Sequence, residues 1–284
     1  MPKQRKIETA TRQLSDLHLE IEKAVRGSTD HQLSDTRARA QELALTALSA
    51  DNTTEELELA VKAVVLNPRC TDALVILADI FEGIDDYVEA MYLIVKRAAE
   101  DLGADLFEQE RGHFWEVLET RPYMRARLQL ALGLREAGMT NQAVAEFEGM
   151  LDLNANDNLG ARFPLLSLYF ESGKVEMASS LLVRFADENS AQFTWLRLLH
   201  AIVLNDNAGA ENELLRARAK NKHVEQYLTR KKRLPEQLPE TSSAGAITEA
   251  MVCAFEIQKA WGTYPDAFNW LKGREVPKEK KGKR

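Results

Sequence analysis

The feature of this sequence that most constrains its fold is an internal repeat with a period close to 34 residues. One column of mostly small residues recurs at intervals of 34, 53, 35 and 34 residues, and the interval of 53 is one period plus an insertion of 19. A second column, headed by leucine, recurs at the same intervals. Repeats of about 20 to 50 residues form stacks of similar units, so the repeat dictates the architecture. The first column is Glu56, Ala90, Ala143, Ala178 and Asn212, and the second is Leu43, Leu77, Leu130, Leu165 and Leu199.

The unit with the clearest pattern runs from Met124 to Asp157. Leu130 and Leu134 lie one helical turn apart in its first half, and Phe147 belongs to the apolar positions of its second half. Gly138 lies between the halves, where a helix end often needs the left-handed backbone that glycine adopts without strain, and Gly173 has the same place in the next unit. Each unit is therefore predicted to be two antiparallel helices of about 12 to 15 residues, whose apolar face is covered by the next unit.

This pattern resembles the tetratricopeptide repeat, a helix-turn-helix unit of about 34 residues. The resemblance implies an all-α fold, a right-handed α-solenoid of about five such units with extra capping helices. Glu56 and Asn212 depart from the family pattern because they replace an expected alanine, and His200 replaces a small residue. Pro164 is a further departure, because it stands inside the first turns of a predicted helix.

The same pattern divides the chain into a leading helix, an array with one insertion, a group of capping helices and a tail. The apolar residues between positions 7 and 26 are spaced as in an amphipathic helix, and the tail is polar. The predicted regions are a leading capping helix in 1–36, the array in 37–226 with an inserted helix in 103–121, capping helices in 227–273, and a disordered basic tail in 274–284. The predicted units lie near 37–70, 71–104, 124–158, 159–192 and 193–226.

The C-terminal part has a second, narrower resemblance. Its ending is similar to that of a little-studied group of repeat proteins related to the suppressor-of-tumorigenicity-seven family, in which a tail of this type closes the array. That resemblance implies no reaction. The residues that carry it are Asn221, His223, Val224, Tyr227, Leu228, Pro235, Pro239, Glu249, Ala250, Trp261, Trp270 and Leu271.

Composition and charge exclude several classes of protein. Hydrophobic residues make up 45% of the chain, enough for a continuous core, but no apolar run is long enough to cross a bilayer. The start of the chain lacks the apolar segment of a secretory signal, so we expect a cytoplasmic protein without membrane contact. The net charge of −7 conceals two basic segments, residues 216–233 and 272–284, in an otherwise acidic chain. Cys70 and Cys253 are predicted to be buried apolar residues.

Sequence motifs of catalysis are absent. The chain contains no glycine-rich phosphate loop, no dinucleotide fingerprint, no nucleophile elbow and no zinc-protease motif. Its five histidines are scattered, without the spacing of three or four residues that would place two imidazoles on one helix face. We therefore expect a protein that is not an enzyme and that has no cofactor and no metal site.

Arginines interleaved with aromatic residues around the insertion form the candidate binding site. Such a pattern can clamp a carboxylate or phosphate and stack on planar groups. The alternative is that the aromatic residues pack the insertion onto the array and that the arginines pair with surface acids. The predicted partner-binding residues are Trp115, Arg121, Tyr123, Arg125, Arg162 and Phe163.

The function predicted from these features is a non-catalytic scaffold that binds a peptide or helix of a partner protein in the groove of the array. Substitution of Arg125 is expected to weaken this binding with little change in melting temperature. The alternative function is association with nucleic acid through residues 216–233 and 272–284, which would weaken steeply with salt. The sequence leaves the partner, the oligomeric state, and whether the basic C-terminal helix fills the chain's own groove undetermined.

Overall fold

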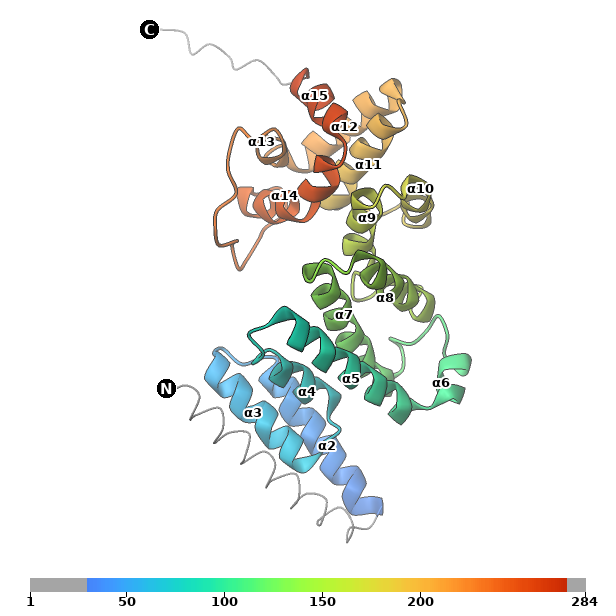
Figure 1. Ribbon diagram of the computed structural model, residues 1–284, viewed down its shortest axis with the longest axis vertical. Coiled ribbons are helices and arrows are strands. Elements are labelled where there is room, and N and C mark those ends of the chain that lie inside the picture. The colour runs from blue at the N-terminus through green and yellow to red at the C-terminus, as the bar shows by residue number, and fades with distance from the viewer. Residues whose placement is uncertain (1–29, 275–284) are drawn as a thin grey trace. The chain divides into compact units, whose positions relative to one another are not determined.

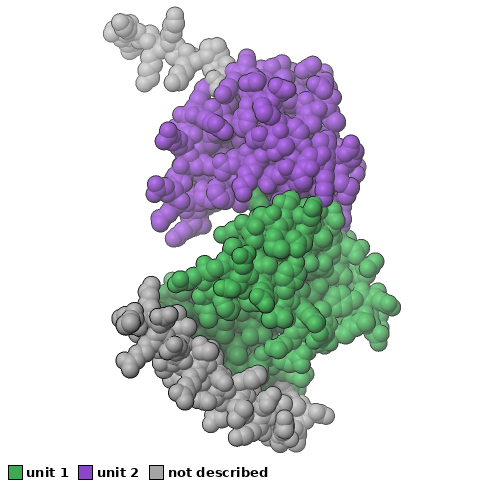
Figure 2. Space-filling view, in the orientation of Figure 1, with its two compact units in different colours: residues 1–159 green, residues 160–284 purple. Residues whose placement is uncertain are grey.

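The computed structural model of the chain describes residues 30–274, and in this range the regular structure is helical apart from one isolated bridge (Figure 1). The leading helix predicted between positions 7 and 26 lies outside the described residues, as does the tail after Arg274. The contacts between residues divide the chain into unit 1, residues 1–159, and unit 2, residues 160–284 (Figure 2).

Unit 1 contains three helical hairpins in its described part. The first helices of the hairpins are neighbours, since α4 packs against both α2 and α7. The second helix of the middle hairpin, α5, also packs against α7. The hairpins are α2 (Asp30–Ala47) with α3 (Thr53–Leu66), α4 (Thr71–Ala78) with α5 (Ile84–Leu102), and α7 (Arg121–Glu136) with α8 (Thr140–Leu153).

Small residues allow the helices of unit 1 to approach closely, as the repeat pattern predicts. Ala44, Ala60 and Ala63 are fully buried in one cluster where α2 meets α3. At the crossing of α5 and α7, a Cβ atom added to Gly133 would lie 2.8 Å from the ring of Tyr87. A larger residue at position 133 would require the ring of Tyr87 to move.

Two of the turns between paired helices use the predicted glycine device. Gly138 and Gly173 have φ values of 74° and 69°, in the left-handed region. After α7 the N–H of Met139 donates to the carbonyl of Leu134 at 2.8 Å, which satisfies an orphan group of the helix end. Asn205, with φ 58°, takes the place of glycine in the last hairpin, because asparagine tolerates this conformation better than most residues.

The insertion differs from the single helix predicted over 103–121. It forms a short helix, α6 (Ala104–Gln109), and a 3-10 turn, η1 (Leu118–Thr120). Between them the backbone pairs with the end of α8, since the N–H of Phe114 donates to the carbonyl of Leu153 at 3.0 Å and the carbonyl of Gly112 accepts from Ala155 at 3.0 Å. Because the N–H of Phe114 and the carbonyl of Gly112 are bonded to Leu153 and Ala155, they are not available for the hydrogen bonds of a continuous helix.

Unit 2 contains two more hairpins, followed by a closing group of helices. Pro164 lies in the first turn of its first helix, where the missing N–H breaks no intrahelical bond. Within the described residues the chain therefore has five hairpins, and the predicted all-α fold of repeated helical hairpins is confirmed. The elements are α9 (Arg162–Glu171) with α10 (Val175–Arg184), α11 (Ala191–Val203) with α12 (Asn207–Asn221), then α13 (Val224–Leu228), α14 (Ile247–Gly262) and α15 (Pro265–Lys272).

The helix α14 covers the first helices of unit 2. It packs against α9 and α11, with the ring of Trp261 6.4 Å from that of Trp195 on α11. Trp261 is fully buried, so this contact is part of the core. A helix of the chain itself thus covers the first helices of both hairpins of unit 2. The residues of α14 that are buried are Ala250, Cys253, Ala254, Ile257, Ala260 and Trp261.

Asn221 holds α14 in place and explains part of the C-terminal sequence pattern. Its side-chain nitrogen donates to the carboxylate of Glu249 at 2.8 Å and to the carbonyl of Ala246 at 2.9 Å. Its backbone carbonyl accepts from the indole of Trp195 at 3.2 Å. After α12, the basic segment 216–233 forms only the short α13, and the chain then turns at Arg230, whose φ is 59°.

Candidate functional site

An ion pair with a buried carboxylate joins the three first helices of unit 1. Asp72, which is only 2% exposed, lies in the first turn of α4. Arg125 on α7 donates from Nε to one carboxylate oxygen of Asp72 at 2.8 Å and from Nη2 to the other at 2.5 Å. Gln41 on α2 also donates to this carboxylate, at 2.6 Å. A buried charge is tolerated when it is paired and hydrogen-bonded in this way, so Arg125 has a structural role in unit 1.

Trp115 lies beside two arginines of the predicted site. The guanidinium carbon of Arg121 lies 5.2 Å from the centre of the indole, and that of Arg125 lies 6.0 Å from it. Arg121 also donates from Nε to the backbone carbonyl of Trp115 at 2.9 Å. The insertion therefore orients the guanidinium of Arg121 while leaving its two terminal nitrogens to make further contacts.

Tyr123 belongs mainly to an aromatic cluster beneath the insertion. Its ring meets that of Phe107 edge-on at 5.2 Å and that of Phe114 at 6.1 Å, and only 6% of the residue is exposed. Burial raises the pKa of Tyr123, although the neighbouring Arg127 acts in the opposite direction. This arrangement agrees with the alternative interpretation of the aromatic residues, in which they pack the insertion onto the array.

Three of the predicted residues line a cavity of about 520 Å³ at the N-terminal ends of α4 and α7. We call this cavity the arginine pocket. Four arginines and two carboxylates line it, together with aliphatic side chains, of which Leu118 is 68% exposed. The residues of the arginine pocket are Arg37, Gln41, Leu45, Asn67, Arg69, Cys70, Thr71, Ala98, Asp101, Leu102, Leu118, Glu119, Arg121, Pro122, Tyr123 and Arg125.

The four arginines of the pocket differ in how far they are neutralised. Arg69 forms an ion pair with Asp101 at 2.6 Å, and Arg125 is bound to Asp72. Among the residues that the structure describes, no carboxylate pairs with Arg37 or Arg121. The pocket therefore presents two guanidinium groups that lack an acidic partner within the described chain.

Arg37 and Arg69 were not predicted from the sequence, although one signal for Arg37 was present. Arg37, Gln41 and Leu45 lie four residues apart along α2, a spacing that places them on one face of a helix. Arg69 stands in the loop before α4, so no helical periodicity marks it.

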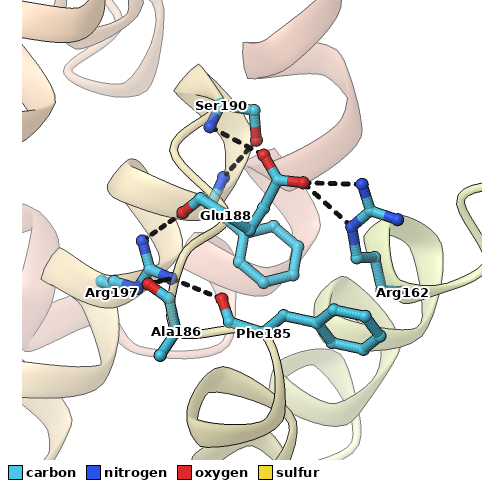
Figure 3. A network of polar contacts seen from close by, with 7 residues as sticks. Arg162, Phe185, Ala186, Glu188, Ser190 and Arg197 are labelled. Atoms are coloured by element: carbon cyan, nitrogen blue, oxygen red, sulfur yellow. Dashed lines mark hydrogen bonds and ion pairs between the residues drawn. The ribbon is translucent and has the colours of Figure 1, made fainter. Parts of the chain in front are cut away.

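Arg162 and Phe163, the other two predicted residues, belong to unit 2. Arg162 takes part in a network that closes the loop between α10 and α11 (Figure 3). Arg162 donates from Nε and Nη2 to one carboxylate oxygen of Glu188, at 3.0 and 2.6 Å. Its guanidinium carbon lies 4.4 Å from the ring centre of Phe163, which meets Phe193 edge-on at 5.4 Å. Both predicted residues thus contribute to the packing of unit 2.

A second arginine completes this network at the end of α10. Arg197 donates to the carbonyls of Phe185 and Ala186, at 2.8 and 3.0 Å, and to that of Glu188. A positive charge at the C-terminal end of a helix is favourable because it meets orphan carbonyls and the negative end of the helix dipole. Burial acts to raise the pKa of Glu188, but the bonds from Arg162 and from the N–H of Ser190 outweigh it, so the pKa is lowered.

Within residues 30–274 no group of three or more His, Cys, Asp or Glu side chains is arranged to hold a metal ion. None of the helices in the same range combines the length and the apolar character that a membrane crossing requires.

Comparisons with known proteins add little to these observations. No protein-family model matches the sequence, and no curated protein matches it. Among solved structures, the fold has a weak likeness to that of pilF of Pseudomonas aeruginosa, with a TM-score of 0.35 and 21% sequence identity, covering 64% of this chain and 90% of that one. The fold is similar to tetratricopeptide repeats in its consecutive helical hairpins and in the glycine turns of two of them.

Proposed function

We propose that this chain is a non-catalytic protein-interaction module that binds an acidic segment of a partner protein in the arginine pocket of unit 1. The observation that carries the proposal is the cavity of about 520 Å³, in which Arg37 and Arg121 have no acidic partner among the described residues and lie near aliphatic side chains. A carboxylate from a partner would supply the missing charge.

The helices around the pocket favour the same ligand. The N-terminal ends of α4 and α7 lie at the pocket, and a helix N-terminus carries a partial positive charge. Leu45, Leu102 and Leu118 offer apolar surface beside the arginines, and burying it would add to the binding free energy. The ligand that fits is a polypeptide segment with an acidic residue next to apolar ones.

The predicted contact residues take different parts in this proposal. Arg121 contacts the partner directly, and Trp115 keeps its guanidinium in place. Tyr123 and Arg125 line the pocket and maintain its walls, because one is in the aromatic cluster and the other binds Asp72. A partner contact through Arg162 and Phe163 stays a prediction, and it requires that a ligand compete with Glu188.

The nucleic-acid alternative is supported less well, because several cations of the basic segments have acidic partners. Arg218 donates to both carboxylate oxygens of Glu225, at 2.7 and 2.8 Å. Arg216 pairs with Glu213 at 2.9 Å, and Arg274 pairs with Glu211. A titration of the chain with a single-stranded oligonucleotide at about 50 mM salt tests the alternative, since binding through phosphates must appear there and weaken steeply as salt is added.

We also propose that the C-terminal part is related to the group similar to the suppressor-of-tumorigenicity-seven family. The contacts of Asn221 with Glu249 and Trp195 support a structural reason for that sequence pattern, since these residues hold α14 on the array.

Site-specific photo-crosslinking tests the proposed function. A photoreactive residue at Leu118 reports on the arginine pocket, and the same residue at Leu215 on α12 is a matched control, because the two side chains are 68% and 67% exposed. We expect the photoreactive residue at position 118 to form a crosslink with a partner protein in native lysate, and the same residue at position 215 to form none. It also expects Arg37→Glu combined with Arg121→Glu to remove this product.

Lys62→Glu on α3 is the control for a change of charge in unit 1, because Lys62 lies outside the arginine pocket and 62% of its side chain is exposed. A crosslinked partner that persists in the Arg37 and Arg121 double variant would exclude the arginine pocket as the binding site. Melting curves of all variants separate loss of binding from loss of folding.

A further inference from the structure

The exposed face of α7 leads from the arginine pocket to a second cavity of opposite charge. Arg125, Gln129, Leu132 and Glu136 follow one another at spacings of four, three and four residues, which places them on one face of the helix. Arg125 lines the arginine pocket, whereas the other three line a cavity of about 360 Å³ at the opposite end of α7. The two cavities therefore share one helix face.

The second cavity, which we call the acidic pocket, is lined by carboxylates without a basic residue. Its charged side chains are Asp79, Glu82 and Glu136, and Tyr87 adds a neutral phenol. The C-terminal ends of α4 and α7 lie there, and their partial negative charges have the same sign as the carboxylates. The remaining residues of the acidic pocket are Phe81, Gly83, Ile84, Gln129, Leu132 and Gly133.

Two groups of the acidic pocket have raised pKa values, because they are buried and have carboxylates as neighbours. Burial, followed by the nearby Glu56, raises the pKa of Asp79. Burial also raises the pKa of Tyr87 to about 12, and Asp79 and Glu136 add to the effect. A cation close to this pocket would instead lower the pKa of Asp79 and of Tyr87.

The helix α4 has a carboxylate at each end, and within the described chain only the one at its start is neutralised by an arginine. Asp72 at its start is neutralised by Arg125 at the arginine pocket, and Asp79 directly follows its end at the acidic pocket. Arg125, whose own charge is neutralised by Asp72, marks the position of the arginine pocket on α7. It is separated from Glu136 by 11 residues, about 16 Å at 1.5 Å per residue. The open face of unit 1 is thus positive at one end and negative at the other, over about three helical turns.

Unit 2 shows how this chain covers the equivalent face of its own first helices. There α14 packs against α9 and α11, using apolar residues at helical spacing such as Ala250, Ala254, Ile257 and Trp261. In the described part of unit 1 no such helix lies on α4 and α7 over the two pockets. The first helices of the two units are equivalent positions of the repeat. Because α14 covers them in unit 2, an amphipathic helix is the ligand that we expect on unit 1.

We propose that the partner segment is an amphipathic helix with an acidic residue at one end and a lysine or arginine about three turns away. Its acidic end lies in the arginine pocket, its basic end lies in the acidic pocket, and apolar residues between them contact Leu132. This inference rests on the proposed function and adds the conformation and the charge order of the ligand.

Three blocked, fluorescein-labelled Leu/Ala-rich peptides of about four helical turns test the inference by fluorescence anisotropy with the full chain. The first has Glu and Arg 11 residues apart on its leucine face, the second has Glu at both positions, and the third has Arg at both. The first peptide is expected to bind at least about tenfold more tightly than the other two, because each of them places like charges together at one pocket.

Glu136→Arg is the decisive variant, since it is expected to shift the preference toward the peptide with two glutamates. Glu58→Arg on α3 is the matched control, because Glu58 is 66% exposed and does not line either pocket. The control must leave the preference unchanged.

The outcomes separate this inference from the proposed function. If the peptide with two glutamates binds the unaltered chain as tightly as the first peptide, or if Glu136→Arg leaves the preference unchanged, the charge order is wrong. If none of the helical peptides binds while the crosslink at Leu118 still depends on Arg37 and Arg121, the helical ligand is wrong and the proposed function stands. Loss of that dependence overturns the proposed function itself.

Discussion

Arg125 on α7 binds the carboxylate of Asp72 on α4 through two nitrogens, across 53 residues of sequence. The pair lies beneath the arginine pocket, so the same guanidinium maintains the packing of the first helices and forms part of the pocket wall. A substitution at Arg125 therefore changes stability and binding together, which is why Arg37 and Arg121 are better probes of binding.

Removal of either member of this pair is expected to destabilise unit 1. Arg125→Ala leaves a carboxylate that is 2% exposed without its cation, and such losses typically amount to about 3 to 5 kcal/mol. Urea unfolding measures the change in the free energy of unfolding. The double variant Asp72→Leu, Arg125→Met should recover much of the loss, because it removes the unpaired charge. A loss from Arg125→Ala as small as that from Lys62→Ala, whose exposed ion pair with Glu58 spans 4.0 Å, would contradict the structural role.

Two glycine-to-alanine changes should have opposite signs. Gly138 has φ 74°, where an alanine costs about 1 kcal/mol or more. Gly262 is in α14, and a Cβ atom there meets no atom within 4 Å, so alanine should stabilise unit 2 by up to about 1 kcal/mol. Thermal unfolding of the two variants checks both signs, and the same sign for both would show that backbone conformation is not the cause.

The stability of unit 2 is expected to fall as pH is lowered through the range in which histidine titrates. Burial lowers the pKa of His200, whose ring accepts or donates a bond of 2.6 Å with the hydroxyl of Ser179 and lies 6.3 Å from Phe170. The unfolded chain, with a histidine pKa of about 6.5, takes up the proton first, so the contribution present above that pH is lost below it.

His200→Gln should flatten this dependence between about pH 7 and pH 5 in urea unfolding experiments. The pKa of Glu188 is lowered, so the contribution of that carboxylate is lost only at more acidic pH and does not overlap the histidine range. An unchanged slope in the His200 variant would assign the pH dependence to other groups.

Tyr87 provides a test of the acidic pocket in the alkaline range. The unfolded phenol ionises near pH 10, whereas burial and then Asp79 and Glu136 raise its pKa to about 12 in the folded chain. Folding stability that is present below pH 10 is therefore lost as pH rises from 10 to 12. Titration of the phenolate absorbance, with Tyr87→Phe to identify its signal, measures the pKa. Glu136→Gln should lower that pKa, and Glu58→Gln should not.

The candidate site could be predicted from the sequence only in part. The pattern of interleaved arginines and aromatics singled out Arg121 and Arg125, which lie together beside Trp115 because they occupy neighbouring turns of one segment. The partner of Arg162 is 26 residues away on another element, and Arg37 reaches the pocket from a different helix. Such proximities depend on how the hairpins stack, and local periodicity contains no information about them.

The sequence by itself determined the helical hairpins and two of their glycine turns. Both depend on interactions within a few residues: apolar side chains one turn apart, small residues at crossings, and the left-handed conformation that Gly138 and Gly173 accept. The tertiary structure decided which charges are neutralised and which faces remain open. Asp72 neutralises Arg125 but not Arg121, and α14 covers the first helices of unit 2, because electrostatic pairing and burial depend on distances between segments that are far apart in the chain.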